Sequence, residues 1–558
     1  MVSYTNGNGA QVQWAYNLRN LPTTITYPGN LNVSRGYDAA GRWTSVQDWN
    51  GNQTSFGYDA NSNLTTETLP TASGVVDTST FDNADRLSAI KVTKGLVPLF
   101  TANYTRDAAN QLTSDSSAST GAGSYKYTPL NQLCYAGAAN LTACSSPPPS
   151  SITYKYDAAD NLTQTGSTQQ VFNNADELCW TASTSGTCST PPTGATTYQY
   201  DTRGNRTSVT PATGQAQTLT YDQANRLTKY AAASTTSYGY NADGLRMSKT
   251  ATATTQFVWD MAAGLPLLLK DGTTAYVYGP GGLPLEQISG SATYYLHHDQ
   301  LGSTRLVTDS SGTGQATYTF DPYGNLVAST GALTNPFRFA GQYLDPESDL
   351  YYLRARYYDP GTGQFMSRDP MVRITRQAYT YAGDTPLNGT DPAGLAWWNQ
   401  AAAAVVGGVG AFVGNAVDNL HSSNPALVAL GVAESVVIAA PIAGVIFVAG
   451  GGAAVAAGIE AVSGAIAATS EAAAVYGPLG GIYTARVLAQ MSQDDYHGFP
   501  TLMDSMVNES DATAGVGADG QAYTYVNLPG FINGCSGTYQ WVINGAGEIT
   551  HRFFAPGT

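Results

Sequence analysis

The sequence predicts a mainly β protein, built as a long antiparallel ribbon of short strands. Two observations carry this prediction. A Tyr-Asp motif followed by Gly or Asn recurs at intervals of roughly 20 residues through the first 330 residues. Gly (60) and Tyr (36) are also abundant in the 558-residue chain, which suits many strands joined by tight turns. After residue 395 the repetition stops and an Ala/Gly-rich apolar sequence begins.

Each repeat unit is interpreted as a strand that ends in Tyr, a turn, and a returning strand. The Asp can accept hydrogen bonds from amides of its own turn, and the Gly or Asn on the far side accepts a positive φ. Alternation such as Thr-Leu-Thr-Tyr (218–221) places apolar side chains on one face. One hairpin cannot bury that face alone, whereas stacked neighbours can. The units begin at Tyr37-Asp38, Tyr58-Asp59, Phe81-Asp82, Tyr156-Asp157, Tyr200-Asp201, Tyr221-Asp222 and Tyr240-Asn241.

The chain is acidic, with 25 Lys and Arg against 40 Asp and Glu and a formal net charge of −15. Nonspecific attraction of the whole chain to nucleic acid or to an anionic membrane is therefore not expected. Met1 is followed by neither a basic segment nor an apolar one, so the sequence predicts no secretory signal in this chain. Export would need another route, or the chain is the tail of a longer protein.

Four of the five cysteines form two pairs of similar spacing, Cys134/Cys144 and Cys179/Cys188, each followed by a Pro-rich turn. This matched spacing favours two disulfide-closed hairpin tips, and free thiols in loops are the alternative. No His lies near either pair, so a metal site is not expected there. Disulfides would point to an oxidising compartment.

The stretch from Asn335 to Leu395 resembles the Rhs repeat-associated core of bacterial Rhs/YD-repeat polymorphic toxins, which are relatives of the teneurin shell. Upstream, Tyr294 to Asp309 is similar to the signature at the end of the family's repeats, and the resemblance covers roughly residues 30 to 395. The residues that carry it are Asn335-Pro336-Phe337-Arg338, Gly341-Gln342-Tyr343, Tyr352, Arg354, Arg356-Tyr357-Tyr358-Asp359-Pro360, Gly363-Gln364-Phe365, Arg368-Asp369-Pro370 and Asp391-Pro392-Ala393-Gly394-Leu395.

The resemblance implies that the ribbon spirals into a hollow shell, complete or partial, around the C-terminal segment. It also implies that this chain is the C-terminal portion of such a toxin. The expected divisions are repeats over 1–310, a core over 311–395 that ends in the sequence DPAGL, an Ala/Gly-rich helical region over 396–490, and a small α+β toxin-like domain over 491–558.

By the same resemblance, the core cuts its own chain between Leu395 and Ala396. Asp369, beside Arg368, matches the family's catalytic Arg-Asp, and Asp391 is the preferred second carboxylate. Two carboxylates in one desolvated pocket have pKa values that move apart, leaving one as base and one as acid.

Two alternatives bear on this site. Asp384 is a lower-ranked substitute for Asp391, and the Asp-Pro turns could simply end strands, as expected at Asp345 and Asp359. His297, His298 and Asp299 could be interpreted as a metal cluster, but hydrogen-bonded histidines at a strand end are the stronger interpretation. We therefore expect neither a metal nor a cofactor.

Residues 435–459 carry no charge for 25 positions, which is long enough for a membrane-spanning helix, and they are rich in small residues. Three interpretations remain open: a hairpin that inserts into a target membrane, a buried helical pair inside the shell, and a resident transmembrane anchor.

The last unit is predicted to have one short helix starting at Pro500 and three strands, at 521–528, 537–544 and 548–554. This layout is analogous, at the level of fold, to barnase-like and colicin-like ribonuclease toxins. His497, His551 and Arg552 could supply an acid–base pair and a cation for RNA cleavage. The alternative is structural: His551 paired on its strand and Arg552 bridged to Asp504 or Glu548.

The sequence is therefore interpreted as a secreted or surface-associated toxin of interbacterial competition, delivered into a target cell. An immunity protein, a secretion or delivery apparatus, the target-cell membrane and RNA are the expected partners. Competing hypotheses are a non-enzymatic adhesion or carbohydrate-binding protein, and a toxin that permeabilises membranes through residues 435–459. Self-cleavage distinguishes the first competitor, because an adhesin has no reason to release its tail.

Overall fold

The fold was analysed in a computed structural model of the chain. The residues that it describes are 2–117, 123–138, 143–144, 148, 151–262, 264–395, 398–399, 482–483, 512–516, 521–532, 535–545 and 548–556. Contacts divide the chain into two units, residues 1–442 and 443–558, which are described separately below.

The first unit is dominated by one 31-stranded sheet in the described part of the chain, in which each strand pairs antiparallel with the next. The predicted continuous β ribbon is confirmed. Its first strands are β1 (Ser3–Thr5), β2 (Gln11–Tyr16), β3 (Pro22–Tyr27), β4 (Leu31–Tyr37), β5 (Trp43–Gln47), β6 (Gln53–Tyr58), β7 (Leu64–Thr68), β8 (Val75–Phe81), β9 (Leu87–Lys94), β10 (Val97–Arg106), β11 (Leu112–Asp115), β12 (Gly123–Tyr127), β13 (Leu133–Gly137), β14 (Ile152–Tyr156), β15 (Leu162–Thr165) and β16 (Thr168–Phe172).

The ribbon continues through the second half of the repeats. These strands are β17 (Leu178–Ala182), β18 (Thr196–Tyr200), β19 (Arg206–Thr210), β20 (Gln217–Tyr221), β21 (Leu227–Ala231), β22 (Thr235–Tyr240), β23 (Arg246–Thr250), β24 (Thr254–Asp260), β25 (Leu267–Asp271), β26 (Thr274–Tyr278), β27 (Pro284–Ser289), β28 (Ala292–His298), β29 (Thr304–Asp309), β30 (Gly314–Phe320) and β31 (Leu326–Gly331). A short 3₁₀ turn, η1 (Pro280–Gly282), separates β26 from β27.

The Tyr and the Asp of the Tyr-Asp motif make hydrogen bonds with different functions. The Asp closes its own turn: Asp59 Oδ1 accepts the amides of Asn61 and Asn63, each at 2.9 Å. The Tyr links one hairpin to the previous one, because the Tyr37 hydroxyl donates to the Pro22 carbonyl at 2.8 Å. The equivalent hydroxyl bonds join Tyr127 to Leu112, Tyr156 to Leu133 and Tyr240 to Leu227. The motif therefore fixes both the turn and the stacking of hairpins.

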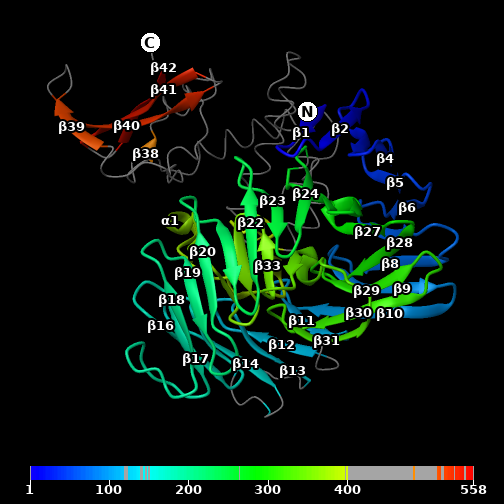
Figure 1. Cartoon of the computed structure of the whole chain (residues 1–558), viewed down its shortest axis with the longest axis horizontal. Coiled ribbons are helices and arrows are strands. Elements are labelled where there is room, and N and C mark those ends of the chain that lie inside the picture. Colours follow the sequence, from blue (N-terminus) through cyan, green and yellow to red (C-terminus); the bar gives the residue numbers. More distant parts are fainter. Residues whose placement is uncertain are drawn as a thin grey trace. The chain divides into compact units, whose positions relative to one another are not determined.

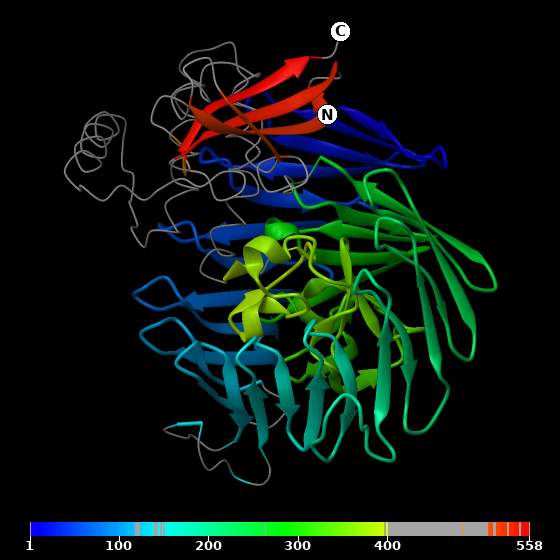
Figure 2. The same cartoon turned by 90° about the vertical axis from the view of Figure 1, so that its left-hand side faces the viewer.

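The core segment forms a small second sheet on the inner side of the curved ribbon, visible in yellow-green in Figures 1 and 2. It contains η2 (Phe339–Gly341), β32 (Tyr343–Asp345), β33 (Leu350–Leu353), β34 (Arg356–Asp359), β35 (Gln364–Phe365), helix α1 (Val372–Thr375), η3 (Ala382–Asp384) and β36 (Gly389–Thr390), which pairs with β37 (Trp398–Asn399). The second unit is a separate sheet of β38 (Ile482–Tyr483), β39 (Ala512–Val516), β40 (Ala522–Ile532), β41 (Cys535–Asn544) and β42 (Glu548–Pro556).

Two arginines of the ribbon anchor the core sheet. Arg246, fully buried, bonds the buried Asp345 and donates to the Tyr357 hydroxyl at 2.7 Å. Arg206, also fully buried, donates to Asp359 Oδ2 at 2.8 Å and to Gln364 at 3.2 Å. A buried charge is tolerated only when it is paired, so these contacts fix where the core sits.

The three strands predicted for the C-terminal unit are present as β40, β41 and β42. Trp541, Val526 and Ile549 are fully buried there. The helix predicted at Pro500 and most of the Ala/Gly-rich region, including residues 435–459, lie outside the described residues. In the described part of the chain no helix is long and apolar enough to cross a membrane.

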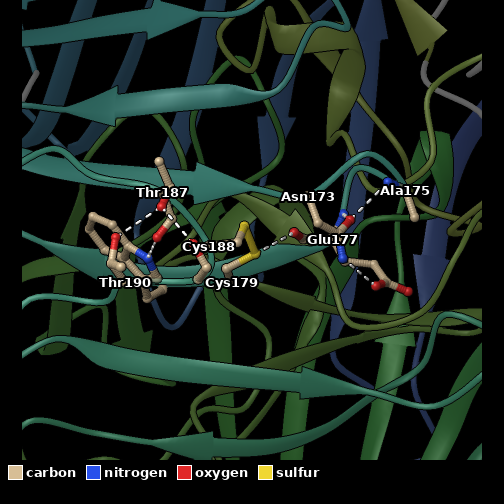
Figure 3. The surroundings of a disulfide bond; sticks show 9 residues. Asn173, Ala175, Glu177, Cys179, Thr187, Cys188 and Thr190 are labelled. Atoms are coloured by element: carbon tan, nitrogen blue, oxygen red, sulfur yellow. Dashed lines mark hydrogen bonds between the residues drawn. A yellow bond between two sulfur atoms is a disulfide. The ribbon is translucent and has the colours of Figure 1, made fainter.

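Both matched cysteine pairs are disulfide-bonded, Cys134 to Cys144 and Cys179 to Cys188, with Cα atoms 5.8 and 5.4 Å apart. Each bond joins a ribbon strand to the long loop that follows it. The surroundings of the second bond are shown in Figure 3.

One carboxyl of the ribbon makes stability depend on pH. Glu67 on β7 lies directly across from Asp77 on β8, and burial, followed by the charge of Asp77, raises the pKa of Glu67 to about 8. Because the folded state holds this proton more tightly than the unfolded state, its stabilisation is present in acid and is lost as the pH rises from about 4.5 to about 8.

We expect Glu67→Gln to remove this dependence. Between pH 4.5 and 8 the free energy of unfolding of the wild type should fall by up to a few kcal/mol relative to the variant, since each pKa unit is worth about 1.4 kcal/mol. Above pH 8 the difference between the two proteins should stay constant. Thermal unfolding across this range measures the difference. Parallel curves throughout would contradict the expected proton uptake.

Candidate active site

The motif Asp391–Leu395 folds back on itself at the end of the core. The Leu395 amide donates to Asp391 Oδ1 at 3.0 Å, so the carboxylate caps its own turn. Gly394 has a φ of +68°. A Cβ there would lie 2.6 Å from the Leu353 carbonyl oxygen and 3.0 Å from the Arg356 nitrogen. This turn therefore needs glycine both for its backbone angle and for its close approach to the β33–β34 connection.

The β33–β34 connection holds the motif along its length. The Ala355 amide donates to the Ala393 carbonyl at 3.2 Å, and Arg354 Nη1 donates to the Pro392 carbonyl at 2.7 Å. Arg356 Nε donates to the Gly394 carbonyl in a short bond. Three successive backbone carbonyls of the motif are thus held by three successive residues of the core.

Arg356 also joins two carboxylates. Its Nη2 lies 3.3 Å from Asp391 Oδ2 and 3.5 Å from Asp369 Oδ2. All three side chains are at most 5% exposed. Burial lowers the pKa of Arg356, and the two carboxylates oppose that shift. One guanidinium therefore allows two acidic groups to share a buried site.

The Arg356 guanidinium also packs on an aromatic ring and has one nitrogen without a described partner. Its carbon lies 3.6 Å from the centre of the Phe365 ring. Arg356 Nη1 is buried and has no hydrogen-bond partner among the described residues. A buried N–H without a partner is costly, and this one lies on the guanidinium that contacts both carboxylates.

Asp369 is fixed independently of Arg356. Its Oδ1 accepts the Met371 amide at 2.7 Å, and its Oδ2 accepts the Thr375 hydroxyl at 3.2 Å. Both donors belong to the turn and helix α1 that follow Asp369. Its side chain is therefore oriented before any substrate group arrives.

The structure brings together Asp369, Asp391 and Leu395 but leaves Arg368 apart. Arg368 is exposed, and the cation between the carboxylates is Arg356, which was not predicted to belong to this site. The available signal was an arginine inside the run LYYLRARYYD, because a charge in a buried, Tyr-rich strand needs partners.

Asp384 occupies a different place. It is 2% exposed and accepts a hydrogen bond from Gln132 Nε2 at 3.3 Å. Burial raises its pKa well above the usual range, and the nearby Asp160 and Asp157 add to the shift. Asp384 thus belongs to a contact between the core and the ribbon.

The His297-His298-Asp299 segment is occupied by structural bonds. His297 Nδ1 pairs with Asp77 at 2.7 Å and Nε2 lies 2.9 Å from the Thr308 hydroxyl. His298 Nε2 bonds the Pro284 carbonyl, and Asp299 pairs with Arg305 at 3.2 Å. Among the described residues no group of three or more His, Cys, Asp or Glu could hold a metal ion.

The C-terminal candidates lie only partly within the described residues. His497 lies outside the described residues. His551 sits on β42 opposite Val542, with its ring 6.0 Å from that of Phe553. Arg552 is the next strand position, opposite Trp541.

The chain matches two family models, Teneurin YD-shell over residues 268–386 and RHS Repeat over residues 37–73. Together they cover the end of the ribbon, much of the core and an early Tyr-Asp unit. Both matched segments are of the Rhs/YD-repeat type. The observed ribbon of Tyr-Asp hairpins is the fold that these matches describe.

Curated relatives of this chain carry different activities in their names. A tRNA(Glu)-specific nuclease WapA of Bacillus subtilis subsp. natto is 36% identical over 113 residues, which is 19% of this chain and 5% of the relative. The double-stranded DNA deaminase toxin A of Burkholderia cenocepacia is 34% identical over 109 residues, 18% of this chain and 8% of the relative. The chain spans less than a tenth of these relatives.

Solved structures with the same fold include a TcdB2-TccC3-TEV crystal structure. It is 19% identical to this chain, with a TM-score of 0.56, and the match covers 69% of this chain and 21% of that one. At this identity the similarity concerns the fold alone.

We expect Gly394→Ala to destabilise the core beyond the strain of its backbone angle. A non-glycine residue at positive φ costs about 1–3 kcal/mol, and the added Cβ would also collide with the Leu353 carbonyl. Gly244→Ala is the matched control, because Gly244 has a φ of +82° with no atom within 4 Å of its Cβ. Thermal unfolding should show the larger loss for Gly394→Ala; equal losses would contradict the tight packing of the motif.

Proposed function

We propose that this chain is the C-terminal part of an Rhs-family polymorphic toxin, and that its core hydrolyses the bond between Leu395 and Ala396. The observation that carries the proposal is the buried Arg356 guanidinium, which contacts Asp369, Asp391 and the Gly394 carbonyl together. The bond to be cleaved follows Leu395, which is the residue after Gly394 in the same turn.

The chemistry follows from two carboxylates with different environments. One accepts a proton from water as the water oxygen bonds to the Leu395 carbonyl carbon, and the other gives a proton to the Ala396 nitrogen as the C–N bond breaks. Arg356 Nη1, without a described partner, can donate to the oxyanion that forms on the carbonyl oxygen. The bond from Leu395 N to Asp391 would hold the substrate close to one carboxylate.

Cleavage would free residues 396–558, the variable effector, while the ribbon acts as its packaging. The relatives' names support this division, since a tRNA nuclease and a DNA deaminase toxin both match this chain over about a fifth of its length. We assign the effector to interbacterial competition, with a cognate immunity protein and a delivery apparatus as partners, and we place the protein outside the producing cell. A ribonuclease that uses His551 is the preferred effector chemistry, with His497 and Arg552 as further candidates.

A surface protein without cleavage is the second candidate. A salivary gland surface protein 1 of Aedes aegypti is 39% identical to this chain over 133 residues, covering 23% of this chain and 4% of that protein. Such a protein would keep the same ribbon and would have no use for the paired carboxylates.

A denaturing gel of the purified chain tests autoproteolysis. The wild type should give two bands, with Ala396 as the first residue of the smaller fragment. Asp369→Asn and Asp391→Asn should leave the chain intact, because each removes one of the two proton-transfer groups. Arg356→Lys should slow cleavage by at least about tenfold, since lysine cannot hold the carboxylates and the carbonyl together.

Asp384→Asn is the matched control and should cleave like the wild type, because Asp384 bonds Gln132 instead of Arg356. If the wild-type chain stays intact, the autoproteolysis proposal is wrong and the surface-protein alternative is favoured. A fragment beginning at Leu395 would move the reaction to the Gly394–Leu395 bond, which contradicts the assigned bond.

Expression inside a bacterium tests the effector. The wild-type chain should stop growth and degrade tRNA or total RNA, Asp369→Asn should be less toxic, and His551→Ala should be harmless although still cleaved. Growth arrest with intact RNA would discard the ribonuclease. Full toxicity of His551→Ala would contradict the role of this histidine.

A further inference from the structure

A short segment of the core, residues 366–369, is bonded to the ribbon and ends in one of the two candidate carboxylates. The Arg206 amide on β19 donates to the Met366 carbonyl at 2.8 Å. The next core residue, Ser367, forms an antiparallel bridge with Asn205. The segment therefore meets the ribbon where a turn ends and β19 begins.

This ribbon turn, residues 201–205, is closed by its own aspartate. Asp201 Oδ1 accepts the amides of Arg203 and Asn205, each at 2.9 Å, and its Oδ2 accepts the Asn205 side-chain amide at 2.9 Å. Asn205 is fully buried, and its Nδ2 also donates to Asn225 in the following Tyr-Asp turn at 2.9 Å. These bonds fix the backbone of the 201–205 turn without help from the core.

Tyr379 connects the 201–205 turn to the backbone of Asp369. Its hydroxyl donates to the Gly204 carbonyl at 2.9 Å, and its side chain is buried. The preceding residue, Ala378, accepts the Asp369 amide at 2.8 Å. Asp369 is therefore bonded to the direct neighbour of a residue that is itself bonded to the ribbon.

Gly204 allows the core to approach the turn closely. It has a φ of +80°, and a Cβ there would lie 2.5 Å from the Tyr379 hydroxyl oxygen and 3.2 Å from the Arg368 Cβ. Arg368 directly precedes Asp369, so any side chain at position 204 would press on both neighbours of the Asp369 backbone. Gly244, in another turn of the ribbon, has a φ of +82° and no atom within 4 Å of its Cβ position. The space around position 204 thus serves the contact with the core.

The same core segment is also bonded to the strand that carries Arg356. The Met366 amide donates to the Tyr357 carbonyl on β34 at 2.8 Å, and Tyr357 directly follows Arg356. The segment is therefore bonded both to the ribbon and to β34. A displacement at the ribbon turn would move Asp369 relative to Arg356, which lies 3.5 Å from its Oδ2.

We propose that the 201–205 turn positions Asp369 through its contact with Tyr379. The inference rests on the proposed function, because this position matters only if Asp369 takes part in cleavage after Leu395. Gly204 and Tyr379 are then positioning residues, which act on the reaction through the backbone of Asp369. Proton transfer requires hydrogen-bond reach, and a misplacement of about 1 Å can slow a reaction about a hundredfold.

Cell-free synthesis of the full chain, followed by a chase and a denaturing gel, measures how fast new chains are cut. Gly204→Ala should be cut at least about tenfold more slowly than the wild type, because its Cβ displaces Tyr379 and Arg368. Gly244→Ala is the matched control, with the same backbone strain and open space around its Cβ, and should be cut at the wild-type rate. If both glycine variants are cut equally fast, the positioning role is wrong.

Removing the hydroxyl separates positioning from a general loss of stability. Tyr379→Phe should be cut about threefold or more slowly, which is the worth of one hydrogen bond. Tyr27→Phe loses an equally buried bond, at 2.7 Å to the Tyr276 carbonyl within the ribbon, and should be cut like the wild type. Equal rates for the two tyrosine variants would overturn the proposal, and they decide the matter if Gly204→Ala does not fold.

The double variant Gly204→Ala/Tyr379→Phe tests whether the two residues act through one contact. It should be cut faster than Gly204→Ala alone, because the added Cβ no longer meets the hydroxyl oxygen. Independent effects would make the double variant slower than either single variant. A double variant that is no faster than Gly204→Ala would therefore contradict the contact.

Hydrogen exchange in the uncut Asp391→Asn chain measures the order of the Asp369 segment without relying on cleavage. Adding Gly204→Ala should speed exchange of amides 366–369 at least about tenfold, whereas adding Gly244→Ala should not. Unchanged exchange would overturn the positioning role. A wild type that is never cut would instead overturn the proposed function, so the two failures are distinguishable.

Discussion

The structure of the first unit depends on two buried arginines of the ribbon that pair with carboxylates of the core. Arg206 and Arg246 are both fully buried, and their carboxylate partners Asp359 and Asp345 belong to the core sheet. Removing one member of a buried ion pair costs about 3–5 kcal/mol because the other charge is left uncompensated. The core is therefore held in one position relative to the wall. That position in turn fixes the β33–β34 connection and the turn that it holds.

The candidate site also depends on a buried arginine that pairs with carboxylates. Arg356 contacts two buried carboxyl groups, and it also bonds the backbone of the adjacent turn. Its unpaired nitrogen is the exception in an otherwise satisfied network. Arg246 also has one buried nitrogen, Nε, without a partner among the described residues, so what distinguishes Arg356 is that one guanidinium contacts two carboxyl groups and the Gly394 carbonyl.

Local features of the fold could be predicted from the sequence, and features built by distant residues could not. The Tyr-Asp hairpins, the cysteine pairing and the strands β40 to β42 follow from turn chemistry and alternation, which act over a few residues. The pairing of Arg356 with Asp369 and Asp391 joins positions 13 and 35 residues away, and Gln132 meets Asp384 across 252 residues. No pattern of spacing encodes such contacts. The resemblance did bring forward Asp369 and Asp391, which lie together on Arg356, but it paired Asp369 with the neighbouring Arg368.

The ribbon carries one register shift per Tyr-Asp hairpin, at the strand residue that precedes the turn, as between Gly36 and Tyr37 or between Gly239 and Tyr240. Side chains alternate between faces with a period of two, so adding or deleting one whole hairpin moves no residue from the inside to the outside. The ribbon can therefore lengthen or shorten by complete hairpins without reversing which face of a strand is buried. The core cannot change length in this way, because it is held by single residues, Asp345 and Asp359, whose spacing must match their arginine partners on the ribbon.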